Sequence, residues 1–270
     1  MSEPLFGEFP ASTKEQWLEK ANAELKGKDI NQLAAFDEPE TIQIFPYLTA
    51  EDLSAIPLPN LPALFLKKEG NDWEYRELNT QKTAQYIVEA KGAHIAAELA
   101  DALYCGNEYL VQMTDAGMTV DEACRNMEFR FNCSPLYFPE IAKLRAARIL
   151  WAMVIEKYAP KDPSTNKMFI HAYTSFKTLT TTDIHANIIR ATTQAMAAVI
   201  GGCDGLTVLP FDLKVKEPDE FSQRIARNIS LILKHEANLH RVVDPSAGSF
   251  YIETLTHLLA KEAWERFVIN

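Results

Sequence analysis

Met168-Phe-Ile-His-Ala-Tyr173 is the stretch that decides the fold, because this apolar run predicts a buried strand. A threonine-rich loop follows it, and a helical pattern then extends over residues 183–200 to a turn at Gly201-Gly202. A second apolar segment, Leu206-Thr-Val-Leu-Pro-Phe211, completes the unit. Strand, helix and strand in this order predict a βαβ unit with parallel strands.

The same alternation recurs along the chain. Strand candidates lie about 40 residues apart with a helical pattern in each gap, at 86–88, 127–131, 169–173 and 206–209. Upstream, 64–66 and 73–75 are further strand candidates, which form either a hairpin or two separate strands. Four parallel βα units amount to half of an eight-stranded barrel. The sequence therefore predicts an α/β fold of parallel βα repeats, a truncated TIM-barrel-like half-barrel domain, over residues 61–270.

We interpret residues 1–60 as an N-terminal helical and extended arm with a proline-rich linker, without a core of its own. Ser12 and Glu15 have the spacing of a capping box at the start of a helix. The buried stripe of that helix is expected at Trp17, Leu18, Ala21 and Leu25. Thr41-Ile-Gln-Ile-Phe45 alternates like a half-exposed strand. Three prolines within 56–62 predict an extended linker.

Composition and charge exclude several classes of function. Of the 270 residues, 47% are hydrophobic, which is enough for a real core. A net charge of −10 argues against nucleic acid or an anionic membrane as a partner, and no apolar run approaches the ~20 residues of a membrane span. The first residues lack the features of a secretory signal, and the four cysteines show no CxxC pairing. We therefore expect a cytoplasmic protein with reduced thiols and no metal site.

His171, at the end of the central predicted strand, is the best candidate for a functional residue. Tyr173, Thr174 and Ser175 follow it and bring hydroxyl groups to the carboxyl end of the sheet, where ligands bind in such folds. A histidine in this place can donate a hydrogen bond to a ligand or polarise a carbonyl. The alternative is a histidine satisfied by its neighbours in the fold.

Other polar residues have a simpler interpretation. Asp183, near His185, is expected to be an N-cap rather than a base. Three side chains on one side of a helix are expected to form an ion-pair network, or alternatively to hold a phosphate or carboxylate: Arg224, Arg227 and Asn228. The turn Asp244-Pro-Ser-Ala-Gly-Ser249 has backbone donors that can face an anion. We expect a solvated helix face at Glu140, Lys143, Arg145 and Arg148.

Four stretches together resemble the methylmalonyl-CoA mutase family. They are Glu140-Ile-Ala-Lys-Leu-Arg-Ala-Ala-Arg148, Arg190-Ala-Thr-Thr-Gln-Ala-Met-Ala-Ala-Val-Ile-Gly-Gly202, Phe221-Ser-Gln-Arg-Ile-Ala-Arg-Asn228 and Val243-Asp-Pro-Ser-Ala-Gly-Ser-Phe-Tyr251. The match is collinear over about residues 86 to 268, and the N-terminal segment looks like the small, non-catalytic subunit. The resemblance implies a coenzyme-A-binding TIM barrel. It also implies isomerisation of methylmalonyl-CoA and succinyl-CoA by a radical route that uses adenosylcobalamin.

The departures from the family pattern fall on its functional positions. The Tyr-His pair of the family is Tyr86-Ile87 here, so the histidine expected at the substrate thioester is absent. His171, Thr174 and Ser175 match the family motif, but Tyr173 replaces the glutamine that would meet cobalamin. The family's Asp-Glu is Asp212-Leu213. Most of the first half of the barrel is missing before Tyr86, and the Asp-x-His-x-x-Gly motif is absent, so we expect no cobalamin-binding domain.

The resemblance and its departures together predict a degenerate small subunit. We expect the chain to bind no cofactor alone and to support a large catalytic mutase subunit that carries adenosylcobalamin, as a pseudoenzyme in a heterodimer. The half-barrel leaves sheet edges exposed, so self-association through those edges is the other partner prediction. Two alternative functions stay open. One is an isomerase completed by a partner chain, with substrate binding at His171, Thr174 and Ser175, and the other is a stand-alone acyl-CoA or small-ligand binder.

Overall fold

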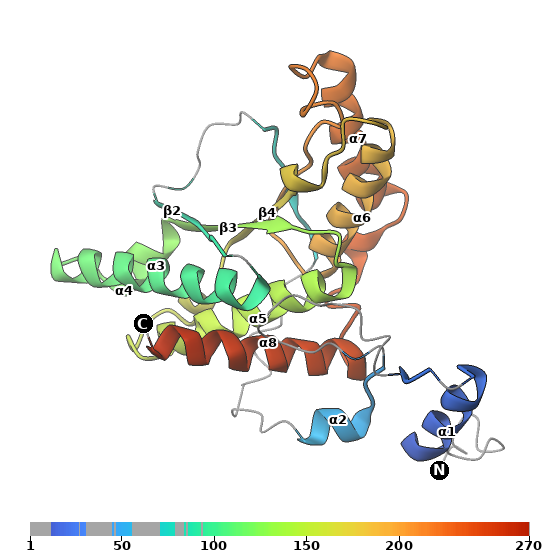
Figure 1. Cartoon of the computed structure of the whole chain (residues 1–270). Helices are drawn as coiled ribbons and strands as arrows, with labels where there is room; N and C mark the ends of the chain where they lie inside the picture. The colour runs from blue at the N-terminus through green and yellow to red at the C-terminus, as the bar shows by residue number, and fades with distance from the viewer. Residues whose placement is uncertain are drawn as a thin grey trace, which may run out of the picture.

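Five parallel strands form the centre of the chain in a computed structural model (Figure 1). The structure describes residues 12–26, 28–30, 45, 47–55, 71–78, 84, 86–92 and 94–269. The strands are β1 (Glu74–Tyr75), β2 (Tyr86–Glu89), β3 (Met127–Cys133), β4 (Ile170–Thr174) and β5 (Gly205–Thr207), in the sheet order β1-β5-β4-β3-β2. The predicted α/β fold with parallel βα repeats is confirmed, and β1 adds a fifth strand to the four expected units.

Helices follow the strands as the sequence predicts. The α-helices are α1 (Lys14–Glu24), α2 (Ala50–Ala55), α3 (Ile95–Asp115), α4 (Val120–Arg125), α5 (Tyr137–Glu156), α6 (Ala186–Ile200), α7 (Glu220–His235) and α8 (Phe250–Ile269). Short 3-10 helices are η3 (Pro163–Asn166), η4 (Phe176–Thr178) and η5 (Leu239–Arg241). Helices α3, α5 and α8 pack against one another below the sheet, and α2 packs on α8 (Figure 1). In the described part of the chain, every helix is too short or too polar to span a membrane.

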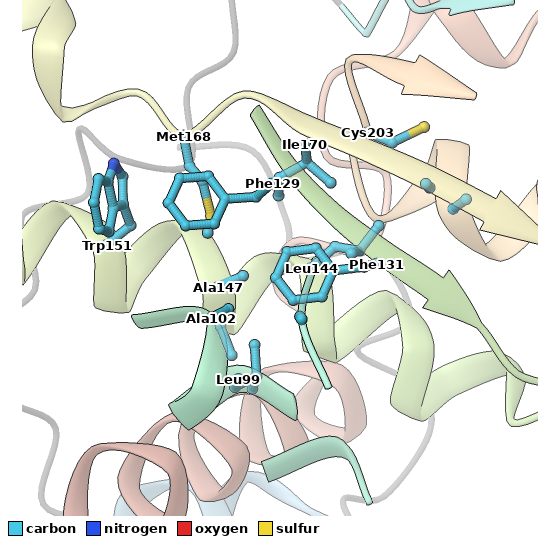
Figure 2. Packing of buried hydrophobic residues seen from close by; sticks show 14 of the residues in the cluster. Leu99, Ala102, Phe129, Phe131, Leu144, Ala147, Trp151, Met168, Ile170 and Cys203 are labelled. Atoms are coloured by element: carbon cyan, nitrogen blue, oxygen red, sulfur yellow. The ribbon is translucent and has the colours of Figure 1, made fainter. Parts of the chain in front are cut away.

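The core lies between the sheet and its helices. Strand β3 alternates apolar and polar residues, so Phe129 and Phe131 point to one side, where both are almost completely buried. The Phe129 ring meets Trp151 of α5 edge-on, with ring centroids 4.7 Å apart, and Figure 2 shows both within the packed cluster. Gly106 of α3 allows this contact, because a Cβ there would lie 2.8 Å from Trp151 and 3.0 Å from Phe129.

Strands β1 and β2 are consecutive in the chain but lie at opposite edges of the sheet. Strand β1 pairs with β5, and β2 pairs with β3, so each has one edge without a partner strand among the described residues. The strand predicted at 73–75 is found as β1, in a parallel pairing with β5. The other strand of the predicted hairpin, 64–66, lies outside the described residues. An open sheet with two free edges fits a half-barrel rather than a closed barrel.

The N-terminal arm differs from its prediction in detail. The helix α1 begins one residue later than expected, with Thr13 as the N-cap and Gln16 completing the capping box. The predicted buried stripe is wrong, because α1 contains no buried residue and Trp17 is 46% exposed. Within the described part of the chain, the side chains of α1 contact Tyr47 and Asp52, which lie outside the core cluster. The strand predicted at 41–45, Phe45 aside, and the proline-rich segment lie outside the described residues.

The solvated face predicted for α5 is also wrong. Its charged residues Glu140, Lys143 and Arg145 are buried. The Lys143 ammonium lies 2.9 Å from Glu98 and 2.7 Å from Glu140, and it donates to the Asn132 carbonyl. These contacts offset the cost of removing charged groups from water. Helix α5 is covered by the sheet and neighbouring helices, so its charges are paired internally instead of facing solvent.

Candidate functional site

The strand register brings several polar side chains to one face of the sheet. Arg130 of β3 is in register with His171 of β4, which is in register with Gly205 of β5. Side chains alternate along each strand, so Glu128, Tyr173 and Thr207 share this face as well. We call it the polar face, and we call the opposite face, with Phe129 and Phe131, the apolar face. His171 is the second residue of β4, so its predicted place at the strand end is wrong.

Glu128 is the centre of the polar face. Its carboxylate accepts a hydrogen bond from Arg130 at 2.9 Å and from Arg76 at 2.6 Å, and His171 Nδ1 lies 2.9 Å away. Burial alone would raise the pKa of Glu128, but the hydrogen bonds from His171, Arg130 and Arg76 outweigh it and lower the pKa to about 2. Glu128 is therefore a permanent anion that ties three strands together.

His171 is held on both ring nitrogens. Its Nε2 lies 2.9 Å from the Thr207 hydroxyl, and its Nδ1 also has the Tyr173 hydroxyl at 3.3 Å. Burial is the main cause that lowers the pKa of His171, and the attraction of the Glu128 carboxylate opposes it only in part. A neutral ring that donates from Nδ1 to Glu128 fits the shortest of these contacts, and its Nε2 faces the Thr207 hydroxyl, which itself donates to the Arg76 carbonyl at 2.9 Å. The imidazole has no nitrogen left for a ligand.

Four members of this cluster are not among the residues predicted from the sequence: Glu128, Arg130, Arg76 and Thr207. The strand Glu128-Phe-Arg-Phe-Asn132 contains a signal, because a charged residue at every second position places charge on one face of a buried strand. Gly205 supplies room on that face. A Cβ there would lie 3.2 Å from the His171 ring, closer than nearly all such contacts.

The residues at the functional positions of the family, which we expect to form a vestigial pocket of Tyr86, Ile87, His171 and Tyr173, are only partly brought together. The register places Ile87 beside Glu128 on the polar face. Tyr86 points to the other face and stacks on Tyr109 of α3, with ring centroids 3.8 Å apart. Thr174 and Ser175 lie at the end of β4, where the Thr174 hydroxyl accepts from Leu209 N and Ser175 N donates to Gln194.

Asp212 follows the segment after β5 and is completely buried. Its nearest cation is Lys216, with Nζ 3.3 Å from Oδ2, and within the described chain neither carboxylate oxygen has a hydrogen-bond partner. Lys216 is half exposed and also contacts Asp219 at 2.6 Å. Asp212 is therefore apart from the His171 cluster and paired through one shared ammonium.

The remaining candidates have structural partners. The N-cap of α6 is His185 rather than the predicted Asp183, although Asp183 accepts from Ala186 N at 3.3 Å. The His185 ring stacks on Phe211. Other contacts are the exposed ion pair of Arg227 with Glu77 and the guanidinium of Arg224 over Phe221. In the turn 244–249, Gly248 N donates to Glu253, and Arg145 binds Asp244 and Glu253. The chain's own carboxylates thus occupy donors that were candidates for an external anion.

The chemistry available on the polar face is limited by this pairing. A general base needs a lone pair within reach of substrate, and the one histidine of the cluster is 2% exposed with both nitrogens engaged. Over the ranges that the structure describes, no three His, Cys, Asp or Glu side chains are placed to hold a metal ion. All four cysteines are free. The geometry is that of a buried ion-pair cluster that joins strands.

Comparison with known proteins gives a consistent result. The sequence profile of a family described as Methylmalonyl-CoA mutase matches residues 71–269. The chain is similar to the methylmalonyl-CoA mutase small subunit of Porphyromonas gingivalis, with 47% identity over 66% of this chain and 29% of the relative. The small subunit of Streptomyces virginiae is 46% identical over 65% of this chain and 28% of the relative.

A large subunit is also similar. The methylmalonyl-CoA mutase large subunit of Propionibacterium freudenreichii subsp. shermanii is 37% identical over 69% of this chain. That match covers 26% of the relative, so the chain spans less than a third of the length of the relatives it matches.

Proposed function

Since the chain belongs to the methylmalonyl-CoA mutase family, we propose that it is a catalytically incompetent, cytoplasmic structural subunit. Its role is to support a large catalytic subunit that interconverts methylmalonyl-CoA and succinyl-CoA. The similarity to two proteins named as small subunits supports this role. The observation that carries the proposal is the state of His171, whose two nitrogens are bound by Glu128 and Thr207 inside the chain.

The polar face does not offer what a substrate thioester needs. A carbonyl is polarised by a donor aimed at its oxygen. Ile87 has no proton to give, and the Tyr173 hydroxyl is directed to His171 at 3.3 Å, with the Arg130 guanidinium over its ring. Opening the cluster to a substrate would leave Glu128 or Arg76 buried without its partner, which costs about 3–5 kcal/mol. The cluster therefore favours the empty, paired state.

Adenosylcobalamin, the cofactor that the family resemblance implies, does not fit the residues at this end of the sheet. Tyr173 takes the place of the glutamine of the family and is engaged with His171. Leu213 has no polar side-chain atom where the family has a carboxylate. We therefore assign the cofactor to the large partner.

The free edges of β1 and β2 are the surfaces proposed for the large partner. Both strands have unpaired backbone donors and acceptors along one edge within the described chain. Exposed edges of this kind pair readily with another chain. A large subunit that covers these edges would hide them and complete the sheet. Self-association through the same edges is the competing arrangement.

Titration of the full chain with coenzyme A and, separately, with adenosylcobalamin tests catalytic incompetence. We expect no change in the cobalamin absorption spectrum and no shift in melting temperature with coenzyme A. Tyr173→Phe serves as a matched variant, because it removes only the hydroxyl that contacts His171. Coenzyme A binding that Tyr173→Phe alters would overturn the proposal and would favour an acyl-CoA binder.

A further inference from the structure

Two carboxylates and one ammonium meet beside the carboxyl end of β3. The Lys143 ammonium lies 2.9 Å from the Glu98 carboxylate of α3 and 2.7 Å from the Glu140 carboxylate of α5. The side chains of Lys143 and Glu140 are 0% and 1% exposed, and that of Glu98 is 13% exposed. The Phe131 ring lies 5.8 Å from the ammonium. We call Glu98, Lys143 and Glu140 the Glu–Lys–Glu triad.

The charges of the triad do not balance. When all three groups are ionised, two negative charges face one positive charge, and a buried net charge is costly because little water screens it. The ammonium has three N–H donors, and one of them goes to the Asn132 carbonyl at 2.7 Å. Within the described chain, Glu140 Oε2 makes no well-aligned hydrogen bond although it lies next to the ammonium. One proton on a carboxylate would remove the excess charge.

The fold changes the proton affinity of Glu98 and of Lys143 in the same direction. Burial, together with the Glu140 charge, raises the pKa of Glu98, and the attraction of Lys143 opposes this only in part. Burial alone would lower the pKa of Lys143, but the two carboxylates outweigh it and raise that pKa. These directions favour a triad in which Lys143 stays charged and Glu98 is protonated.

The titratable and charged groups on the surrounding elements have other partners. Cys133 of β3 lies beside the triad, and burial raises the pKa of its thiol well above the ordinary value, so it is neutral. Cys203 is its neighbour. The other groups are engaged elsewhere: His94 and Asp101 of α3 accept from backbone amides, Arg190 of α6 donates to Asn187, Glu253 of α8 pairs with Arg145, and His257 lies near that pair.

The triad lies where three elements are joined. Glu98 is in the first turn of α3, directly after the connection from β2. Gly92 of that connection packs on the backbone of Glu98, where an added Cβ would collide. Asn132 N of β3 donates to Glu98 at 3.4 Å, and Lys143 brings the contact of α5. The triad therefore ties the start of α3 and the end of β3 to α5.

We propose that the Glu–Lys–Glu triad is a pH-sensitive switch, which holds one proton on the Glu98 carboxyl and loosens the start of α3 from α5 when that proton is lost. The proton comes from solvent to form the O–H bond of Glu98, and it returns to solvent when the bond breaks. The two carboxylates then repel each other across one ammonium. The switch does not rest on the proposed function.

The pH dependence of this switch is opposite to that of the polar face. The folded pKa of Glu98 is raised above its ordinary value of 4.5. Its contribution to stability is therefore complete below pH 4.5 and is lost as the pH rises through the folded pKa. Glu128 and His171 have lowered pKa values, so both contribute less as the pH falls. The sign of the pH dependence thus separates Glu98 from the other two groups.

Infrared difference spectroscopy of the folded chain detects the proton directly. We expect the absorption of one protonated carboxyl group to persist above about pH 5.5, where ordinary carboxyl groups are ionised, and to vanish at higher pH. Glu98→Gln should lack this absorption. Glu140→Gln should move its loss to a lower pH, because one carboxylate then faces one ammonium. Glu108→Gln is the matched control, since Glu108 is exposed on the same helix and should change nothing.

Hydrogen exchange at residues 98–100 measures the loosening of α3. After correction for intrinsic exchange, the opening constant should rise about tenfold per pH unit above pH 4.5 and level off beyond the folded pKa of Glu98, because opening releases one proton. Glu98→Gln should show no such rise.

Either of two results overturns the switch. One is the absence of a protonated carboxyl absorption from the original chain above about pH 5.5, which needs no variant to fold. The other is an opening constant that follows the same pH dependence in the original chain and in Glu98→Gln, which would leave the triad a structural contact with all three groups ionised.

Discussion

The two faces of the sheet use the same strands for opposite purposes. On the apolar face, Phe129 and Phe131 pack against α5 and bury almost all of their surface. On the polar face, their immediate neighbours Glu128 and Arg130 hold His171 in an ion-pair cluster. The apolar face therefore stabilises the fold by excluding water, and the polar face joins strands β1, β3, β4 and β5 through charges. On this face both nitrogens of His171 are engaged within the chain.

Truncating one phenylalanine on each face should separate the two contributions most clearly. Phe129→Ala should lower the free energy of unfolding by about 3–5 kcal/mol, because it leaves a cavity beside Trp151. Phe169→Ala is the matched control, since Phe169 is 37% exposed and contacts the Arg76 guanidinium. Its cost should stay near 1 kcal/mol. Urea unfolding of both variants measures the difference, and equal costs would contradict the division between the faces.

Acid should reduce the contribution that the polar face makes to the free energy of unfolding. The folded pKa of Glu128 is about 2, below its ordinary value of 4.5, so its stabilisation is complete above pH 4.5 and is lost as the pH falls toward 2. We expect the difference in unfolding free energy between the original chain and Glu128→Gln to shrink by about 2 kcal/mol in that window. Urea midpoints at about pH 4.5 and about pH 2.5 measure it. A difference that is the same at both pH values would contradict the assigned role of Glu128.

The lowered pKa of His171 also makes the folded chain less stable in acid, but this loss of stability begins at a higher pH. Its ring is neutral in the fold, whereas the unfolded chain takes up a proton below about 6.5. Stability from this group is therefore present above pH 6.5 and declines as the pH falls. The acid window below pH 4.5 isolates Glu128 from this effect.

Substitution of one glycine beside each face should have a smaller effect on stability, and the two effects can be compared. Gly106→Ala should cost about 1–3 kcal/mol, because the new Cβ would lie 2.8 Å from the rigid Trp151 ring. Gly205→Ala should cost less, because its Cβ would lie 3.2 Å from the His171 ring, which has to shift by only a few tenths of an ångström. Thermal unfolding of the two variants gives the ranking. A larger loss for Gly205→Ala would show that the polar cluster tolerates less movement than the core.

Restoring one family residue on the polar face should have no effect on activity. Ile87→His returns the histidine of the family pattern, but the other substrate and cofactor contacts are still absent, so we expect no conversion of methylmalonyl-CoA. The assay supplies adenosylcobalamin, with Ile87→Leu as the control. Appearance of mutase activity in Ile87→His would overturn the structural role.

The sequence predicts the elements of this fold better than the contacts between them. Strands at Tyr86 and Met127 and the last helix are found close to their predicted positions, because local periodicity reports them directly. The polar cluster was missed because its partners are distant in the chain, with Arg76 and Glu128 52 positions apart and Glu128 and His171 43 positions apart. Burial of Lys143 was missed for the same reason, since its partner Glu98 lies 45 residues away.

The central claim is that this chain is a structural subunit for a larger catalytic chain. The most direct test is the native mass of the complex that it forms when purified from the cell that produces it. We expect a heteromer with a larger chain that carries cobalamin, and a mass that includes both chains. A homo-oligomer or a monomer, with no larger chain present, would contradict it.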